Sequence, residues 1–188
     1  MTTETDHART GARAGTTRVL MVLESYPPAL PPGGEALPVG SAWFYAACRR
    51  WGVAPDLLAA ARRVNALDRP PVGNWYPRAR ARVRAALLAC RPEAVGAAGW
   101  VARSAVRGAL GLPARGLEWL EPVDAALPGG GGNGRAVLRA LAVPHFSGRS
   151  RVLNDRELRR ATSAALEAAF AAGPFASTGR VASSPPHG

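Results

Sequence analysis

The stretch Val143-Pro-His-Phe-Ser-Gly-Arg-Ser-Arg-Val-Leu-Asn-Asp155 joins a predicted strand to a predicted helix near the end of the chain. An apolar run over 137–143 precedes it, and an amphipathic segment over 156–171 follows it. In an open α/β sheet, ligands bind at the loops just beyond the carboxyl ends of the strands. This strand-to-helix turn is therefore the first candidate for a functional site, and His145 is its most reactive side chain.

Working outward, the same alternation of apolar and amphipathic segments fills the chain. Strands are predicted at 18–23, 64–71, 91–98 and 137–143, and helices at 42–51, 55–63, 77–90, 99–110 and 156–171. Ser41 and Gly52 have the positions of a helix N-cap and C-cap, and Asn154 with Glu157 has capping-box spacing. Residues 112–134 are predicted to be irregular. The pattern predicts a three-layer α/β/α sandwich around a central, mainly parallel four-stranded sheet.

The length of 188 residues favours one domain, placed at 18–172, between disordered tails at 1–17 and 173–188. No apolar run approaches the ~20 residues that span a bilayer, and the N-terminus lacks the apolar region of a secretory signal. The two cysteines, Cys48 and Cys90, are too few for a disulfide framework and are expected to be buried thiols. We therefore expect a cytoplasmic monomer with no membrane partner.

The chain is strongly basic, with a formal net charge of +11. All 24 basic residues are arginine, and the sequence is also rich in alanine, glycine and proline. Such a charge favours binding to phosphate backbones. A coding bias toward arginine explains the same composition, so the charge permits a nucleic-acid partner without requiring one.

Five short segments occur in an order that resembles one enzyme superfamily. They are Leu23-Glu-Ser-Tyr-Pro-Pro28, Leu37-Pro-Val-Gly-Ser-Ala42, Asn65-Ala-Leu-Asp-Arg-Pro-Pro-Val-Gly-Asn74, Arg91-Pro-Glu-Ala-Val-Gly-Ala-Ala-Gly99 and Pro144-His-Phe-Ser-Gly148. In turn they are similar to a Gly-Glu-Ala-Pro-Gly turn, a Pro-Phe-Val-Gly-Arg-Ala segment, an Asn-Val-Val-Lys-Cys-Arg-Pro-Pro-Gly-Asn stretch, a strand–Gly–helix unit and a His-Pro-Ser motif. These are features of the uracil-DNA glycosylase superfamily, and the likeness is greatest to its thermophile-type branch. It spans residues 18–172.

The resemblance implies the three-layer fold of that superfamily and a role in base-excision repair of DNA. Such enzymes extrude a damaged, deaminated base and hydrolyse its N-glycosidic bond. His145 takes the position of the family histidine that stabilises the leaving base anion, and Asn65 that of the asparagine that reads the base. Ser147, Arg149 and Arg151 are then expected to hold the DNA backbone.

The chain also departs from the family pattern. Asp68 stands in place of a cluster cysteine, so we expect no iron–sulfur cluster, no other cofactor and no metal. In the first motif, either Glu24 supplies the carboxylate that orients water, or Ser25 takes that position and the carboxylate is lost. Pro38 replaces the stacking aromatic residue of the family, with Tyr26, Phe44 or Phe146 as the substitutes; Tyr26 and Phe44 are the candidates for base binding.

Other interpretations of the same residues stay open. One alternative is that the fold is kept, without catalysis, as a nucleobase, nucleotide or nucleic-acid binding module, and another is that it hydrolyses free nucleosides or nucleotides. In a purely structural interpretation, His145 is a hydrogen-bonded loop residue and Asn65 caps a turn. Arg149 and Arg151 would then pair with neighbouring acidic residues or with solvent.

Overall fold

The computed structural model of the protein describes residues 19–25, 36–129, 136–147 and 151–171. The predicted tails at 1–17 and 173–188 lie outside these ranges. The elements follow in this order: β1 (Val19–Ser25), α1 (Ala42–Trp51), α2 (Pro55–Ala60), β2 (Arg62–Leu67), α3 (Tyr76–Cys90), β3 (Ala94–Ala98), α4 (Trp100–Ala109), β4 (Val123–Ala126), β5 (Val137–Val143), a 3-10 helix (Arg151–Asn154) and α5 (Arg156–Ala171). The α/β class predicted from the sequence is confirmed. None of the described helices is both long and apolar enough to cross a lipid bilayer.

The strands form one mixed sheet in the order β2-β1-β3-β5-β4. β2, β1, β3 and β5 run parallel to one another. β4, at the edge of the sheet, pairs antiparallel with β5. The prediction of four strands is therefore wrong, because the sheet has five. β4 lies within 112–134, where irregular structure was expected. Its four residues, Val-Asp-Ala-Ala, carry little strand signal of their own, and pairing with β5 places them, with an ion pair of 3.2 Å between Arg139 and Asp124.

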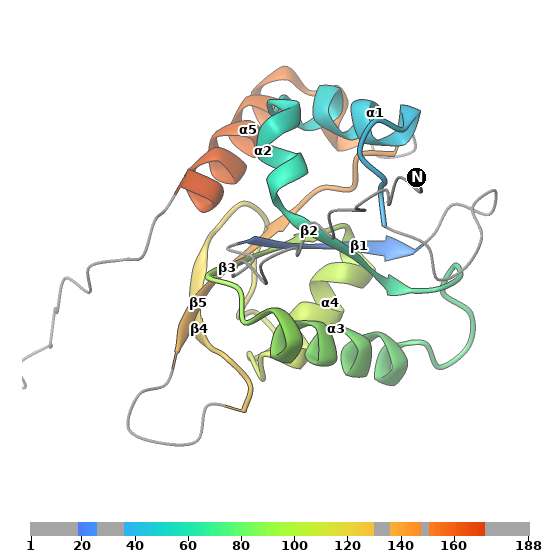
Figure 1. The fold of residues 1–188 in the computed structure, drawn as a ribbon, viewed down its shortest axis with the longest axis vertical. Coiled ribbons are helices and arrows are strands. Elements are labelled where there is room, and N and C mark those ends of the chain that lie inside the picture. The colour runs from blue at the N-terminus through green and yellow to red at the C-terminus, as the bar shows by residue number, and fades with distance from the viewer. Residues whose placement is uncertain (1–18, 26–35, 130–135, 148–150, 172–188) are drawn as a thin grey trace, which may run out of the picture.

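Helices cover both faces of the sheet (Figure 1). α1, α2 and α5 pack on one face, and α3 and α4 pack on the other. The side chains of β1 alternate between the two: Met21 and Leu23 belong to the core under α1, whereas Leu20 and Val22 belong to the core under α3. Burial on both faces explains why the sequence of β1 is a continuous apolar run.

α1 is capped at both ends by the residues that the sequence predicts. The Ser41 hydroxyl accepts a hydrogen bond from the backbone N–H of Phe44, and Gly52 has the left-handed φ of 71° that ends helices. Trp51, the last residue of α1, is fully buried, and its indole N–H donates to the carbonyl of Pro144 at 2.9 Å. This bond ties the segment after β5 to α1.

α2 ends earlier than expected, because a side chain terminates it. Arg63 donates to three carbonyl oxygens at the end of the helix, those of Leu58, Ala59 and Ala61. The Leu58 carbonyl also accepts the backbone N–H of Ala61 at 3.3 Å, and the guanidinium supplies the donors that the last turn of the helix otherwise lacks before the chain enters β2.

α5 begins with a side-chain cap one residue later than predicted. Asp155 Oδ1 accepts hydrogen bonds from the N–H groups of Glu157 and Leu158, at 2.8 and 3.1 Å. Asn154 instead accepts a hydrogen bond from the guanidinium of Arg50 on α1, at 2.8 Å. The capping role expected for Asn154 is therefore wrong.

Gly96 of β3 provides a test of the packing between the central strands. A Cβ at this position would lie 2.4 Å from the sulfur of Met21, its partner on β1. We expect Gly96→Ala to lower the free energy of unfolding by about 1–3 kcal/mol through overpacking, and Met21→Ala by about 2–5 kcal/mol through cavity formation. In the double variant the added methyl group enters the cavity. The double variant should therefore lose less free energy of unfolding than the sum of the losses of the two single variants. Urea denaturation of the four proteins measures this coupling, and strictly additive costs would contradict the contact.

Candidate functional site

The carboxyl ends of the parallel strands meet at one edge of the sheet, and three of the predicted site residues lie there. The register pairs Leu23 of β1 with Asn65 of β2, and Glu24 follows Leu23 directly. His145 comes two residues after the end of β5. β2 lies on one side of β1 and β3 on the other, so the order of strands changes direction beside β1. In open α/β sheets such a topological switch point is where ligands bind.

Glu24 is held at the switch point by the start of α4. Its Oε1 accepts a hydrogen bond from the backbone N–H of Val101 at 3.1 Å, and α4 has no side-chain cap of its own. The carboxylate therefore satisfies a free N–H at the positive end of the helix. Gly99 precedes α4 with a φ of 92°, and a Cβ there would lie 2.3 Å from Oε1, so the position requires glycine. Of the two alignments of the first motif, the one that uses Glu24 has a carboxylate at this edge; the side chain of Ser25 lies outside the described structure.

His145 is placed by the aromatic residue that follows it. Its ring stacks on Phe146, with the ring centroids 4.8 Å apart and the planes inclined by 17°. Phe146 is buried and meets Trp51 and Trp43 of α1 edge-on, at centroid distances of 5.2 and 6.4 Å. The histidine thus lies on a packed aromatic cluster rather than on an unsupported loop.

A backbone hydrogen bond determines which ring nitrogen of His145 carries the proton. The N–H of Ser147 donates to Nδ1 at 3.0 Å, so in the neutral ring the proton is on Nε2. Burial lowers the pKa of His145, and the nearby Glu24 carboxylate offsets part of that decrease. At neutral pH the side chain is therefore an uncharged imidazole with Nε2–H as its donor.

Asn65 is a buried polar residue at the same edge, with an exposed fraction of 3%. It shares a face of β2 with Arg63, whose guanidinium lies over the ring of Phe44 at 5.8 Å. Within the described part of the chain, no hydrogen bond engages the Asn65 amide. Its amide oxygen and nitrogen are not among the fully buried atoms that lack a partner in the described structure, so both can still be reached by a ligand that offers a donor and an acceptor.

The other predicted site residues are placed less favourably. Phe44 is 1% exposed and packs in the core beneath Arg63, which leaves no free ring face for a base. Ser147 is half-buried, and the bond of its N–H to His145 is a positioning contact. Tyr26, Arg149 and the side chain of Arg151 lie outside the described residues.

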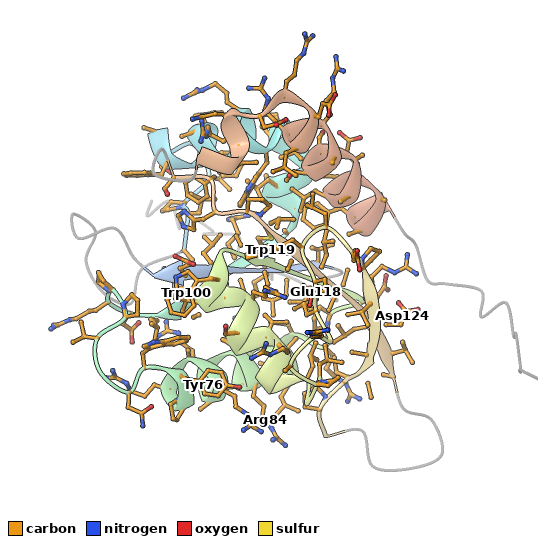
Figure 2. All side chains as sticks on the ribbon, turned by 180° about the vertical axis from the view of Figure 1, so that it is seen from behind. Tyr76, Arg84, Trp100, Glu118, Trp119 and Asp124 are labelled. Carbon is orange, nitrogen blue, oxygen red and sulfur yellow. The ribbon has the colours of Figure 1, made fainter. Side chains whose placement is uncertain are left out.

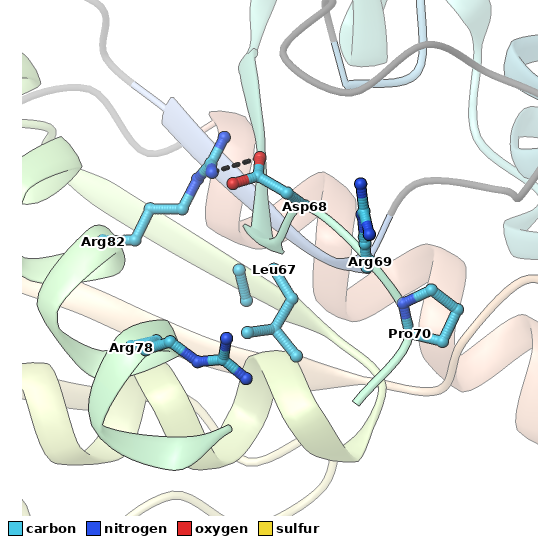
Figure 3. Close-up of a pocket in the computed structure, with 7 residues that line it drawn as sticks. Leu67, Asp68, Arg69, Pro70, Arg78 and Arg82 are labelled. Atoms are coloured by element: carbon cyan, nitrogen blue, oxygen red, sulfur yellow. Dashed lines mark hydrogen bonds and ion pairs between the residues drawn. The ribbon is translucent and has the colours of Figure 1, made fainter. Parts of the chain in front are cut away.

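Two features were not predicted. The first is the cap of α4 by Glu24. In the sequence, only the glycine directly before the helix, Gly99, indicated that another residue must supply the cap. The second is a pocket of about 490 Å³ beyond the end of β2 (Figure 3), lined by Ala66, Leu67, Asp68, Arg69, Pro70, Arg78 and Arg82. The four-residue spacing of Arg78 and Arg82 places both on one side of α3.

In the described ranges, no three His, Cys, Asp or Glu side chains gather into a group suited to a metal ion. Cys48 and Cys90 are buried free thiols, as expected, and burial raises the pKa of Cys48. No protein-family model matches the chain, and no curated protein sequence matches it.

The protonation state of His145 can be measured directly by NMR of protein with ¹⁵N-labelled histidine. The chain has three histidines, so a His145→Gln protein assigns the signal. We expect the Nε2–H form, with a titration midpoint below the ordinary histidine value of about 6.5. Because the unfolded chain then binds more protons than the folded one, stability should fall as the pH drops below about 6.5, until the folded-state pKa is reached. A midpoint above 6.5, or a proton on Nδ1, would contradict the hydrogen bond from Ser147.

Proposed function

We propose that the protein is a cluster-free DNA glycosylase of the uracil-DNA glycosylase type, which hydrolyses the N-glycosidic bond of a deaminated base. The observation that supports the proposal is that Glu24, Asn65 and His145 all lie at or just beyond the carboxyl ends of parallel strands, at one edge of a mainly parallel sheet. These three residues come from separate motifs whose order along the chain resembles that superfamily. The three-layer fold of that superfamily is part of the same proposal.

The reaction assigns a separate task to each end of the site. As the bond between the sugar C1′ and the base nitrogen breaks, its electron pair moves onto the base, and positive charge develops on the sugar. The Nε2–H of His145 donates to the base carbonyl that gains negative charge. Water adds to C1′ and gives up its proton to solvent, while the base leaves as an anion and takes up a proton from solvent; the carboxylate of Glu24 orients this water and stabilises the positive sugar.

The neutral state of His145 suits this task. An uncharged donor, already oriented by Ser147 and Phe146, needs no reorganisation as the base anion forms. The same hydrogen bond to Nδ1 prevents the ring from accepting a second proton without losing its partner. The histidine therefore acts through a fixed hydrogen bond rather than as a proton donor.

Asn65 supplies the selection of the base. Its amide has an acceptor and two donors, which complement the N3–H and O4 edge of uracil. With the amide oxygen facing N3–H and the NH2 facing O4, cytosine would lose both interactions, because it presents an amino group in place of O4 and an unprotonated N3; the discrimination therefore requires that the bound amide keep this orientation. The absence of another partner for this amide among the described residues supports the assignment.

Single-stranded and duplex oligonucleotides that contain one uracil, hypoxanthine or xanthine test the proposal. We expect the wild-type protein to release at least one of these bases and leave an abasic site. His145→Ala should slow release by about a hundredfold or more, because it removes the preorganised donor. Glu24→Gln, which keeps an oxygen acceptor for Val101, should also slow release, because it removes the charge.

Asn65→Ala has a matched control in Asn154→Ala, the same substitution at an exposed residue that bonds to Arg50. The first variant should lose base release and the second should keep it, with both proteins folded by circular dichroism. No abasic product from any substrate at excess enzyme would refute the glycosylase. Retained DNA binding in that case would favour the non-catalytic binding module.

A further inference from the structure

The pocket beyond the end of β2 is basic. Three guanidinium groups, those of Arg69, Arg78 and Arg82, line it together with one carboxylate, that of Asp68. Figure 3 shows that Arg78 and Arg82 come from α3, whereas Asp68 and Arg69 come from the segment after β2. A hollow of about 490 Å³ with this lining suits an anionic ligand rather than an apolar one.

Two of the three charges are available to a ligand. Arg82 pairs with Asp68. Arg69 makes no ion pair or hydrogen bond with another described residue, and Arg78 makes only a long hydrogen bond of 3.4 Å to the carbonyl of Val72. The pocket therefore has excess positive charge that no acidic residue in the described structure neutralises.

The pocket lies at the same carboxyl-terminal edge of the sheet as Asn65, but on the α3 face, whereas Asn65 shares the other face of β2 with Arg63. Leu67, which lines the pocket, is two residues beyond Asn65 on β2, a separation of about 6.6 Å along a strand. Two tryptophans also connect the start of α3 with the start of α4. Trp75, just before α3, meets Trp100 edge-on with ring centroids 5.0 Å apart. Trp100 is the first residue of α4 and immediately follows Gly99 at the Glu24 cap. Figure 2 shows Trp100 at that end of α4, and its side chain is 54% exposed.

We infer that this pocket binds backbone phosphates of the DNA strand whose base enters the site at Asn65. The inference rests on the proposed function for the identity of that strand, but the binding itself requires no catalysis. Guanidinium groups bind phosphate through paired N–H donors, and the pocket offers two that no carboxylate engages. The exposed ring of Trp100, between the pocket and Glu24, adds a surface on which a neighbouring base stacks, as in other sites for single strands.

Binding of an undamaged, fluorescein-labelled single-stranded oligonucleotide of about 15 nucleotides tests the inference, measured by anisotropy over a series of salt concentrations. Arg69→Gln/Arg78→Gln should weaken binding about tenfold and lower the slope of log affinity against log salt by about 1.4, or 0.7 for each lost phosphate contact. Arg80→Gln/Arg84→Gln is the matched control, because it removes the same charge from another side of α3; Figure 2 shows Arg84 away from Trp100. The control should retain the wild-type slope.

Equal losses in both variants, or wild-type binding by Arg69→Gln/Arg78→Gln, would overturn the inference even if the protein releases uracil. Selective loss in that variant, in a protein that releases no base, would support the pocket as a backbone site and refute the glycosylase. If the wild-type protein binds no oligonucleotide at low salt, the inference fails, and the base-release assay then decides the proposed function separately.

Discussion

The pairing of β1 with a parallel neighbour on each side is the constraint on which the rest of the structure depends. It buries both faces of β1, requires helices on both sides of the sheet, and places the ends of β2 and β3 beside Glu24. Because the chain proceeds from β2 across β1 to β3, the strand ends diverge at this edge. This edge is the topological switch point of the sheet, where ligands bind in open α/β folds.

Different contacts fix the two ends of the proposed site. Glu24 is held by the start of α4, a helix on the α3 side of the sheet, whereas His145 is held by Phe146 and the aromatic residues of α1 on the other side. The hydrogen bond from Trp51 to Pro144 connects the second group to the core. The carboxylate and the imidazole are thus each fixed by a different packed layer at the same edge of the sheet, and a substitution in one layer need not disturb the other.

The sequence predicted the elements whose own residues form a clear apolar run or have clear capping chemistry. β1 and β5 are long apolar runs, and α1 begins and ends at residues with clear capping chemistry. β4 was missed because its four residues depend on pairing with β5, and the cap of α5 was misplaced because Asn154 and Asp155 are adjacent and chemically alike. At the site, His145 and Asn65 followed from motif order, but the burial of Phe44 depends on tertiary packing, and the tautomer of His145 depends on the conformation of the local turn that brings the Ser147 N–H to Nδ1. The basic pocket required the three-dimensional proximity of Arg69 and Arg78.

The central claim is that Asn65 and His145 contact one base in one site. Titration of the labelled protein with free uracil, observed at the side-chain amide of Asn65 and at Nε2 of His145 by NMR, tests this most directly. If both residues bind the same base, the Asn65 amide signal and the His145 Nε2 signal shift with one shared uracil binding curve. Cytosine at the same concentrations shifts both signals far less. Movement of only one signal, different curves for the two, or equal responses to uracil and cytosine would contradict the claim.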